Sequence, residues 1–313
     1  MMAQTATQPR ILCTGIIVLD EVFRVETLPL PDTKVEAKDF FIVNGGCAAN
    51  AAVAVARLGG RAKLAGPLGG PAGKDNNGDR VLAALAREHV DTSDCQRVDG
   101  LATALSAIFI DAHGDRTIVT YRDQRIATVT PRDPRAVVEA ADLVLADNRY
   151  PPFVRPICEA ARQRGLRVVL DADKPTTEDD PLFTAATHVV FSSECLVATT
   201  GCSDLAEGLR KMAGHTQAFL AVSNGPNDIL FLEGRALRGV PVFSVQAVDT
   251  LGAGDSLHGG FALALAEGRT EPDALRFGAA VAGIKCSRLG GSAGTPTRAE
   301  VDAFVAEQRV PAP

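Results

Sequence analysis

The stretch VDTLGAGDS at residues 248–256 carries most of the information about fold and function in this sequence. It joins a loop of small residues to an apolar helical pattern that ends at Gly268. The backbone N–H groups of Gly252, Ala253 and Gly254 can converge at the start of that helix, where the positive end of the helix adds to them. The stretch therefore predicts a cradle for the developing charge of a phosphoryl group.

Asp255 lies inside this predicted cradle, and two roles are open for it. An isolated Asp at a helix start is most often a cap or a partner of the helix dipole. A carboxylate within an anion cradle would repel a phosphate, so a second role is plausible there. That role is to accept the proton of a hydroxyl group that attacks the γ-phosphoryl group of a nucleotide.

A second glycine motif, NGGCAAN, occupies residues 44–50 and runs into another helical pattern. Gly45 and Gly46 permit close approach of a ligand to the backbone. Asn50 can bind a polyol or cap the helix, and the residues alone do not separate the two. Asp20 directly follows the first predicted strand, where a carboxylate can bind two sugar hydroxyls or form a turn.

Short apolar and β-branched runs alternate with helical patterns along most of the chain. Because these runs are mostly apolar throughout, they predict strands that are buried on both faces of a sheet. The alternation predicts an α/β fold with a mostly parallel sheet and helices on both faces. The predicted strands cover residues 11–19, 143–146, 168–170, 188–191 and 219–222, and the predicted helices cover 76–88, 153–163 and 205–212.

Two segments depart from this alternation, at residues 21–43 and 102–121. The first is extended and contains two prolines. The second alternates in polarity across a turn at 111–115 and predicts a hairpin. We expect the two segments to form a small antiparallel β lid over the strand ends, within one domain that spans residues 1–313.

Composition excludes several classes of function. The chain has 313 residues, 46% of them apolar, with a net charge of -6, which argues against nucleic acid and anionic membranes as partners. No apolar run reaches the length of a membrane span. The seven cysteines are scattered without a CxxC pair, so reduced thiols and a cytoplasmic location are expected. A phosphate loop at 69–74 is rejected because its glycines are wrongly spaced.

These motifs resemble the ribokinase family, also called PfkB sugar kinases, over nearly the whole chain. The residues 249–255 are similar to its C-terminal signature, and Gly45, Gly46 and Asn50 are similar to its N-terminal signature. The resemblance implies a ribokinase-like fold and a carbohydrate kinase that uses ATP and Mg²⁺. It implies the following roles: Asp255 as catalytic base, Gly252, Ala253 and Gly254 as anion hole, Asp20, Gly45, Gly46 and Asn50 as sugar contacts, and Ser223, Asn224, Gly225 and Thr250 beside the nucleotide.

Some positions depart from the family pattern. Ser192 and Cys195 stand where the family usually carries an Asn and a Glu that organise magnesium, with Glu194 one place early, so the metal ligands stay unassigned. Cys47 stands where ribokinases carry a Lys, which disfavours ribose as substrate. A monovalent cation such as K⁺ near Asp249 is an open expectation.

Within the family, the chain most resembles ketohexokinases and bacterial sulfofructose kinases, which phosphorylate a ketose at a terminal hydroxyl. Arg149 and Lys34 match positions that grip a sulfonate in the sulfosugar enzymes, although Thr120 replaces an expected Asn. We therefore predict phosphorylation of a primary hydroxyl of a fructose-like ketose. The alternatives are a kinase for an anionic ketose such as sulfofructose, and an inactive sugar-binding regulator. A homodimer through the lid is a further expectation from the resemblance.

Overall fold

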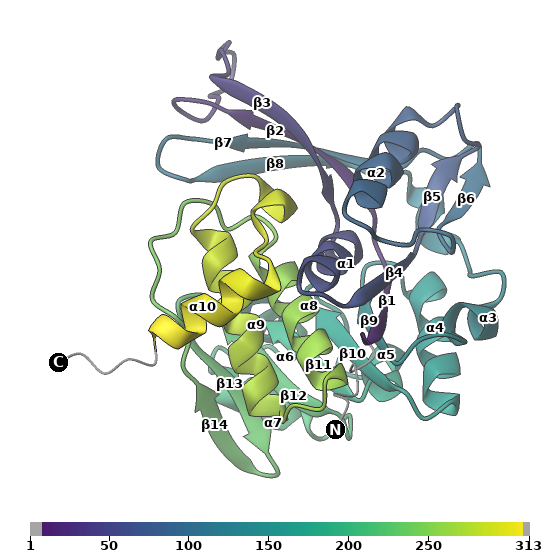
Figure 1. The fold of residues 1–313 in the computed structure, drawn as a ribbon, viewed down its shortest axis with the longest axis vertical. Coiled ribbons are helices and arrows are strands. Elements are labelled where there is room, and N and C mark those ends of the chain that lie inside the picture. The colour runs from purple at the N-terminus through teal and green to yellow at the C-terminus, as the bar shows by residue number, and fades with distance from the viewer. Residues whose placement is uncertain (1–7, 309–313) are drawn as a thin grey trace, which may run out of the picture.

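The main sheet of the protein has eight strands in the order β14-β13-β12-β11-β10-β9-β1-β4 (Figure 1). A computed structural model describes residues 8–308. The six strands from β4 to β12 in this order are parallel, whereas β13 and β14 are antiparallel additions at one edge. The strands are β1 (Arg10–Thr14), β4 (Arg61–Ala65), β9 (Leu143–Asp147), β10 (Arg167–Ala172), β11 (His188–Ser192), β12 (Phe219–Asn224), β13 (Asn227–Glu233) and β14 (Ala236–Val240).

Helices cover both faces of this sheet, as the alternation of apolar runs predicts. Successive strand residues point to opposite faces, so Leu143 and Leu145 join one apolar cluster while Val144 and Ala146 join the other. The first cluster packs α1 (Cys47–Arg57), α8 (Ala253–Ala266) and α9 (Glu271–Cys286), with α10 (Arg298–Glu307) against α9. The second packs α3 (Pro134–Val138), α4 (Pro151–Gln163), α5 (Pro181–Ala185), α6 (Ser193–Thr200) and α7 (Leu205–Met212).

A separate four-stranded sheet, the lid sheet, lies at the top of Figure 1. Its order is β3-β2-β7-β8, and its strands are β2 (Val18–Arg24), β3 (Asp39–Gly45), β7 (Ala104–Ile110) and β8 (Arg116–Tyr121). The hairpin predicted at 102–121 is confirmed as β7 and β8. Helix α2 (Asn76–Arg87) packs under β2 and β3. A two-stranded sheet pairs β5 (Pro67–Gly70) with β6 (Gln96–Asp99), and short turns of helix occupy Gln124–Thr128 and Gly291–Gly294.

The structure corrects two expectations about these sheets. The apolar run 11–19, predicted as one strand, forms parts of two strands. Strand β1 of the main sheet ends at Thr14, and β2 of the lid sheet begins at Val18. Gly15 sits at the break with φ 151°, and a Cβ there would lie 1.9 Å from the carboxylate of Asp147. The lid sheet is also not fully antiparallel, since its central pair, β2 and β7, runs parallel. No helix in the described part of the chain is long and apolar enough to cross a bilayer.

Candidate active site

Two glycine-led helix starts face each other at the carboxyl edge of the main sheet. Gly252, with φ 75°, precedes α8, and Gly46, with φ 91°, precedes α1. Positive φ values of this size favour glycine. Neither helix has a side-chain hydrogen bond at its N-cap. At the start of α8 the N–H of Gly254 has no hydrogen-bond acceptor among residues 8–308, whereas the N–H of Ala253 donates to the carbonyl of Thr250 at 3.2 Å, so the predicted three-residue cradle has one of its donors occupied.

Asp255 lies in the first turn of α8 and points toward α1. Its Oδ2 accepts a hydrogen bond of 2.7 Å from Nδ2 of Asn50. The Oδ1 of Asn50 in turn accepts from Nδ2 of Asn44 at 3.1 Å. Oδ1 of Asp255 accepts no hydrogen bond from residues 8–308, and the residue is part-exposed, so this carboxylate is accessible to a ligand. These two hydrogen bonds, from Asn44 to Asn50 and from Asn50 to Asp255, fix the orientation of the predicted base.

Asp20 reaches the same place from the lid sheet. It is not at the end of a main-sheet strand, as expected, but third in β2, opposite Val43 and Ser106. Burial raises the pKa of Asp20 to about 6, the Ser106 hydroxyl opposes this shift, and the nearby charge of Asp255 adds to it. Gly45 leaves room for it, because a Cβ at Gly45 would lie 2.0 Å from Oδ2 of Asp20.

Two further carboxylates at this edge were missed by the sequence analysis. Asp147 ends β9 and is buried, and its Oδ2 accepts hydrogen bonds from the N–H groups of Ile16 (2.8 Å) and Ala48 (3.2 Å). Its Oδ1 accepts from the N–H of Arg149 at 2.9 Å. Burial raises the pKa of Asp147 to about 7, while these N–H donors favour its charged form. Asp147 therefore fastens the start of α1 to the end of β9.

The second missed carboxylate, Asp171, lies next to the predicted base. One carboxylate oxygen of Asp171, one of Asp255 and Sγ of Cys47 lie within 4.8 Å of one another. Burial raises the pKa of Asp171 to about 6, the imidazole of His258 at 3.6 Å opposes the shift, and Asp255 adds to it. Burial also raises the pKa of Cys47 well above its usual value, so the thiol stays neutral. In the sequence, the feature that could have pointed to Asp171 as a site residue was its position directly after a predicted strand.

Arg149 and Lys34, the pair matched to a sulfonate site, differ in their surroundings. The guanidinium of Arg149 forms an ion pair with Asp173 and is mostly buried. Lys34 is exposed on the loop between β2 and β3 and forms no ion pair with residues 8–308. The charge of Arg149 is therefore neutralised by Asp173, whereas that of Lys34 lies at the surface.

The predicted nucleotide residues lie where β12 ends. Ser223 donates from Oγ to the carbonyl of Phe191 at 3.3 Å, Asn224 is the last residue of β12, and Gly225 follows in a turn with φ 55°. Thr250 is exposed before the cradle, and its Oγ1 accepts a hydrogen bond from Arg116 of β8. Arg116, which the sequence analysis did not select, thus connects the lid sheet to the loop of the cradle.

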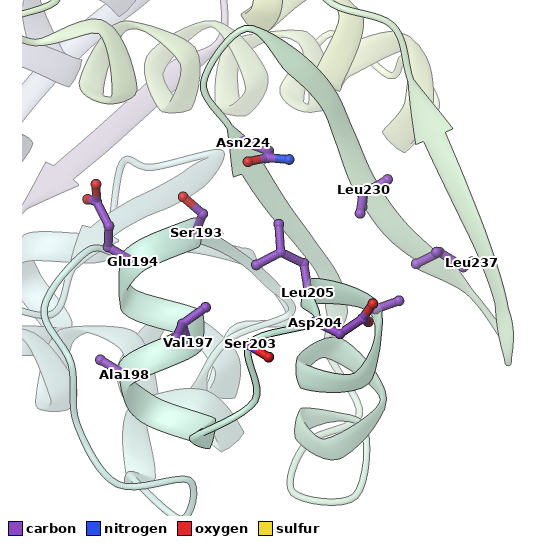
Figure 2. Close-up of a pocket in the computed structure, with 11 residues that line it drawn as sticks. Ser193, Glu194, Val197, Ala198, Ser203, Asp204, Leu205, Asn224, Leu230 and Leu237 are labelled. Atoms are coloured by element: carbon purple, nitrogen blue, oxygen red, sulfur yellow. The ribbon is translucent and has the colours of Figure 1, made fainter.

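The structure also has a cavity of about 830 Å³ between α6, α7 and β12–β14 (Figure 2). Leu205, Leu230 and Leu237 form part of its apolar wall, and Glu194 and Asp204 stand at its rim. No Lys or Arg lines it and two of its lining residues are acidic, so it offers no positive charge to a triphosphate. Asn224 is the only predicted nucleotide residue among those lining it.

The two positions that depart from the family pattern have local roles. Ser192 is the N-cap of α6, and its Oγ accepts a hydrogen bond of 3.1 Å from the N–H of Cys195. Cys195 itself is buried. Glu194 is exposed at the start of α6, so it remains the carboxylate of this segment that faces solvent.

Phosphoryl transfer to an alcohol requires main-chain donors for the transferred group and a carboxylate that can take the alcohol's proton. Both occur at the start of α8, in a covered parallel sheet with a β lid, and they define the class as a phosphotransferase of ribokinase-like fold. A family model described as pfkB family carbohydrate kinase matches residues 8–298. The chain belongs to this family, whose sugar kinases transfer phosphate to hydroxyl groups.

Relatives with names and structures support this assignment. A crystal structure of a candidate ribokinase from Agrobacterium tumefaciens is 35% identical, with a TM-score of 0.91, and the match covers 97% of this chain and 99% of that one. The ketohexokinase of Mus musculus is 28% identical, covering 90% of this chain and 98% of the relative. The ribokinase of Haemophilus influenzae is 26% identical, covering 93% and 96%. The matches therefore include kinases for both pentoses and ketohexoses.

Proposed function

We propose that this protein transfers the γ-phosphate of ATP to a primary hydroxyl of an uncharged, fructose-like ketose. The observation that carries the proposal is the hydrogen bond from Asn50 to Asp255, which holds a part-exposed carboxylate beside an uncapped helix start. Asp20 and Asn44 extend the polar surface toward the lid sheet, where sugar hydroxyls can be bound. The resemblance to ketohexokinase supports the ketose.

The proposed reaction needs one proton transfer and one phosphoryl transfer. Asp255 accepts the proton of the primary hydroxyl as the alcohol oxygen bonds to the γ-phosphorus. The bond between this phosphorus and the β–γ bridging oxygen breaks, and ADP leaves. The N–H groups of Gly252 and Gly254 stabilise the charge on the transferred group, and the N–H of Ala253 joins them once it leaves the carbonyl of Thr250. A carboxylate of ordinary basicity suffices, because a loose transition state depends mainly on positioning.

We also propose Mg²⁺ as the metal that accompanies ATP. Mg²⁺ takes phosphate oxygens, water and one or two carboxylates, and it does not favour thiol ligands. Asp171 and Glu194 fit this requirement: Asp171 is buried, with no hydrogen bond from residues 8–308 to its carboxylate, and Glu194 is exposed at the same sheet edge. Cys47 does not fit as a ligand, because its thiol stays neutral. When bound, the ion neutralises charge on the β- and γ-phosphates.

We propose an uncharged ketose and not sulfofructose as the substrate, because Arg149 already forms an ion pair with Asp173. A guanidinium that already holds a carboxylate gains little from a second anion, and the neighbouring Asp171 and Asp147 would repel one. Lys34 stays at the surface of the lid loop. A kinase for an anionic ketose would need Arg149 to exchange partners when the lid closes.

We place ATP between the loop of the cradle and the end of β12, with Ser223, Asn224, Gly225 and Thr250 beside it. A fructokinase from Xylella fastidiosa, 26% identical with a TM-score of 0.78, was solved with bound ATP and supports ATP as the donor. We do not place ATP in the acidic cavity between α6 and α7. We make no proposal about K⁺. Its effect is measured by comparing kcat of the active enzyme with and without KCl.

We further propose a cytoplasmic homodimer that contacts no nucleic acid or membrane. All seven cysteines are free, which fits a reducing compartment. On the outer face of the lid sheet the ring of Phe23 stacks on that of Phe109 and packs at a tilt against that of Phe40. Val119 and Tyr121 are 62% and 61% exposed there. A second copy covering this apolar face would hide it from water. The dimer is tested by measuring the molar mass of the wild type and of Val119→Asp by light scattering. We expect a dimeric wild type and a monomeric variant. A monomeric wild type would contradict the proposal.

The proposed function is tested by measuring ADP release with a panel of ketoses, pentoses, polyols and anionic ketoses. We expect turnover with an uncharged ketose and no ATP consumption without sugar. A preference for a pentose would contradict the ketose, and a preference for a sulfonated ketose would contradict the uncharged substrate. Tight sugar binding without turnover would instead support the inactive regulator.

A further inference from the structure

Lys285 of α9 is a fully buried lysine directly behind the loop of the cradle. Its side chain is 0% exposed, although lysine is almost never fully buried in proteins. Its Nζ donates a hydrogen bond of 2.7 Å to the backbone carbonyl of Asp249 and lies 3.1 Å from Oδ2 of the same residue. A leucine or methionine would fill this position without burying a charge, so the ammonium group calls for an explanation.

The carboxylate of Asp249 connects Lys285 to two segments of the site. Its Oδ1 accepts a hydrogen bond of 2.8 Å from the N–H of Leu251, just before the cradle. Its Oδ2 accepts from the N–H groups of Gly290 (3.1 Å) and Gly291 (3.0 Å), in the segment that follows α9. One carboxylate therefore holds the loop of the cradle against the end of α9.

Each member of this pair favours the charged form of the other, against the effect of burial. Burial lowers the pKa of Lys285, and the Asp249 carboxylate opposes that shift. Burial works against ionisation of Asp249, yet Lys285 and the N–H groups of Gly291 and Leu251 hold its pKa below the ordinary value. Charged partners in such an environment form stronger and shorter hydrogen bonds than neutral ones, so they fix a loop more rigidly.

Other side chains also contact the cradle: Nδ1 of His258 lies 2.7 Å from the carbonyl oxygen of Gly254, and Arg116 donates a hydrogen bond to Oγ1 of Thr250. Gly252 is the N-cap of α8 and offers no side-chain hydrogen bond. The direction of the first N–H groups of α8 therefore also depends on the backbone before it, from Asp249 to Leu251, which the Asp249 carboxylate holds. Val248 and Asp249 are also hydrogen-bonded through their N–H groups to the carbonyl of Cys286, one residue after Lys285.

We propose that Lys285 is a positioning residue for phosphoryl transfer, a tethered cation that holds the 249–254 loop so that its N–H groups converge on the transferred phosphate. This inference rests on the proposed function of Asp255 and its cradle. Lys285 does not contact the reacting atoms and acts through Asp249. Its positive charge also lies behind the N-terminus of α8, where it adds to the potential that favours developing negative charge.

The first experiment measures steady-state kinetics and chemical rescue with the full-length chain. For Lys285→Ala we expect kcat to fall about 100-fold with a sugar KM changed less than about threefold, because the lost effect concerns the transition state. Methylammonium chloride should restore kcat, since it returns a cation to the space left by the side chain. Lys63→Ala removes another lysine that pairs with a carboxylate, Asp94 at 2.6 Å, and its kcat should not respond to the salt.

A second variant separates positioning from a purely structural role. Lys285→Ala leaves the Asp249 carboxylate without its buried partner and can destabilise the fold. The double variant Asp249→Asn with Lys285→Met removes both charges together. We expect it to fold, by its melting temperature and circular dichroism, and to keep the low kcat.

The result that overturns the proposal is a normal kcat in either the folded Lys285→Ala variant or the double variant. A low kcat in Lys285→Ala that methylammonium does not raise also counts against a tethered cation. Failure of the proposed function has a different signature, because the wild type itself would then phosphorylate no sugar in the panel.

Discussion

Replacing Asp255 with Asn removes the basicity of the carboxylate while keeping its shape. The side chain of Asn can still accept the hydrogen bond that Asn50 donates over 2.7 Å, so the orientation at the start of α8 is preserved. What is lost is the oxygen that takes the alcohol's proton. General base catalysis contributes about 10²–10⁴-fold, and we expect kcat to fall by about 10³-fold, which corresponds to about 4 kcal/mol of barrier.

The assay for Asp255→Asn is sugar-dependent ADP release, with ATP binding measured separately by calorimetry. The affinity for ATP should change by less than about threefold, because Asp255 acts on the alcohol and not on the nucleotide. Asp133→Asn is the matched control: Asp133 caps α3 through hydrogen bonds of 3.1 Å from the N–H groups of Arg135 and Ala136, and Asn caps a helix equally well. A kcat for Asp255→Asn within about tenfold of wild type would refute the base assignment.

Three other predictions concern the sugar side of the site. In Gly45→Ala the new Cβ would lie 2.0 Å from Oδ2 of Asp20 and displace this carboxylate. The sugar KM should therefore rise about tenfold or more while the ATP KM stays unchanged. An unchanged sugar KM would argue against a contact between Asp20 and the sugar. Because the pKa of Asp20 is about 6, its charged form is lost as the pH falls through 6, and the sugar KM should rise below that pH in wild type but not in Asp20→Asn. In Asp173→Ala the guanidinium of Arg149 loses its partner, so the preference for an uncharged over a sulfonated or phosphorylated ketose should fall about tenfold, while a constant ratio contradicts the role given to this ion pair.

The sequence predicted the main sheet well because its signals are local. Strands β9 to β12 are short, apolar on both faces and separated by helices, so their period and breakers are visible in the chain. The start of α8 was also predictable, since small residues followed by an apolar helical pattern have few other interpretations. The hairpin of β7 and β8 was found from its turn.

The lid sheet was harder, because its pairings join distant segments. The parallel pairing of β2 with β7 brings together residues about 86 positions apart, such as Val18 and Ala104, and no local pattern encodes it. The break at Gly15 was hidden because the strands on both sides of it contain buried apolar residues, β1 in the main sheet and β2 in the lid sheet. Asp20 was therefore assigned to the wrong sheet, and its place near Asp255 became visible only in the structure.

The missed residues share one property: their meaning depends on the environment that folding creates. Asp147 and Asp171 end strands, which is common, and only their burial beside one another and Asp255 makes them notable. Lys285 lies in a helical pattern where a lysine normally faces water, and only the packing of α9 on α8 shows that it is buried. Arg116 was one of several charged residues in the hairpin until its contact with Thr250 placed it near the cradle.

The most direct test of the account is to identify the product by phosphorus NMR after incubation with ATP, Mg²⁺ and an uncharged ketose. The account predicts ADP and a phosphate ester whose phosphorus couples to the protons of a CH₂ group, formed only when sugar is present and formed about 10³-fold more slowly by Asp255→Asn. Release of inorganic phosphate regardless of sugar, or an ester on a secondary carbon, would contradict it.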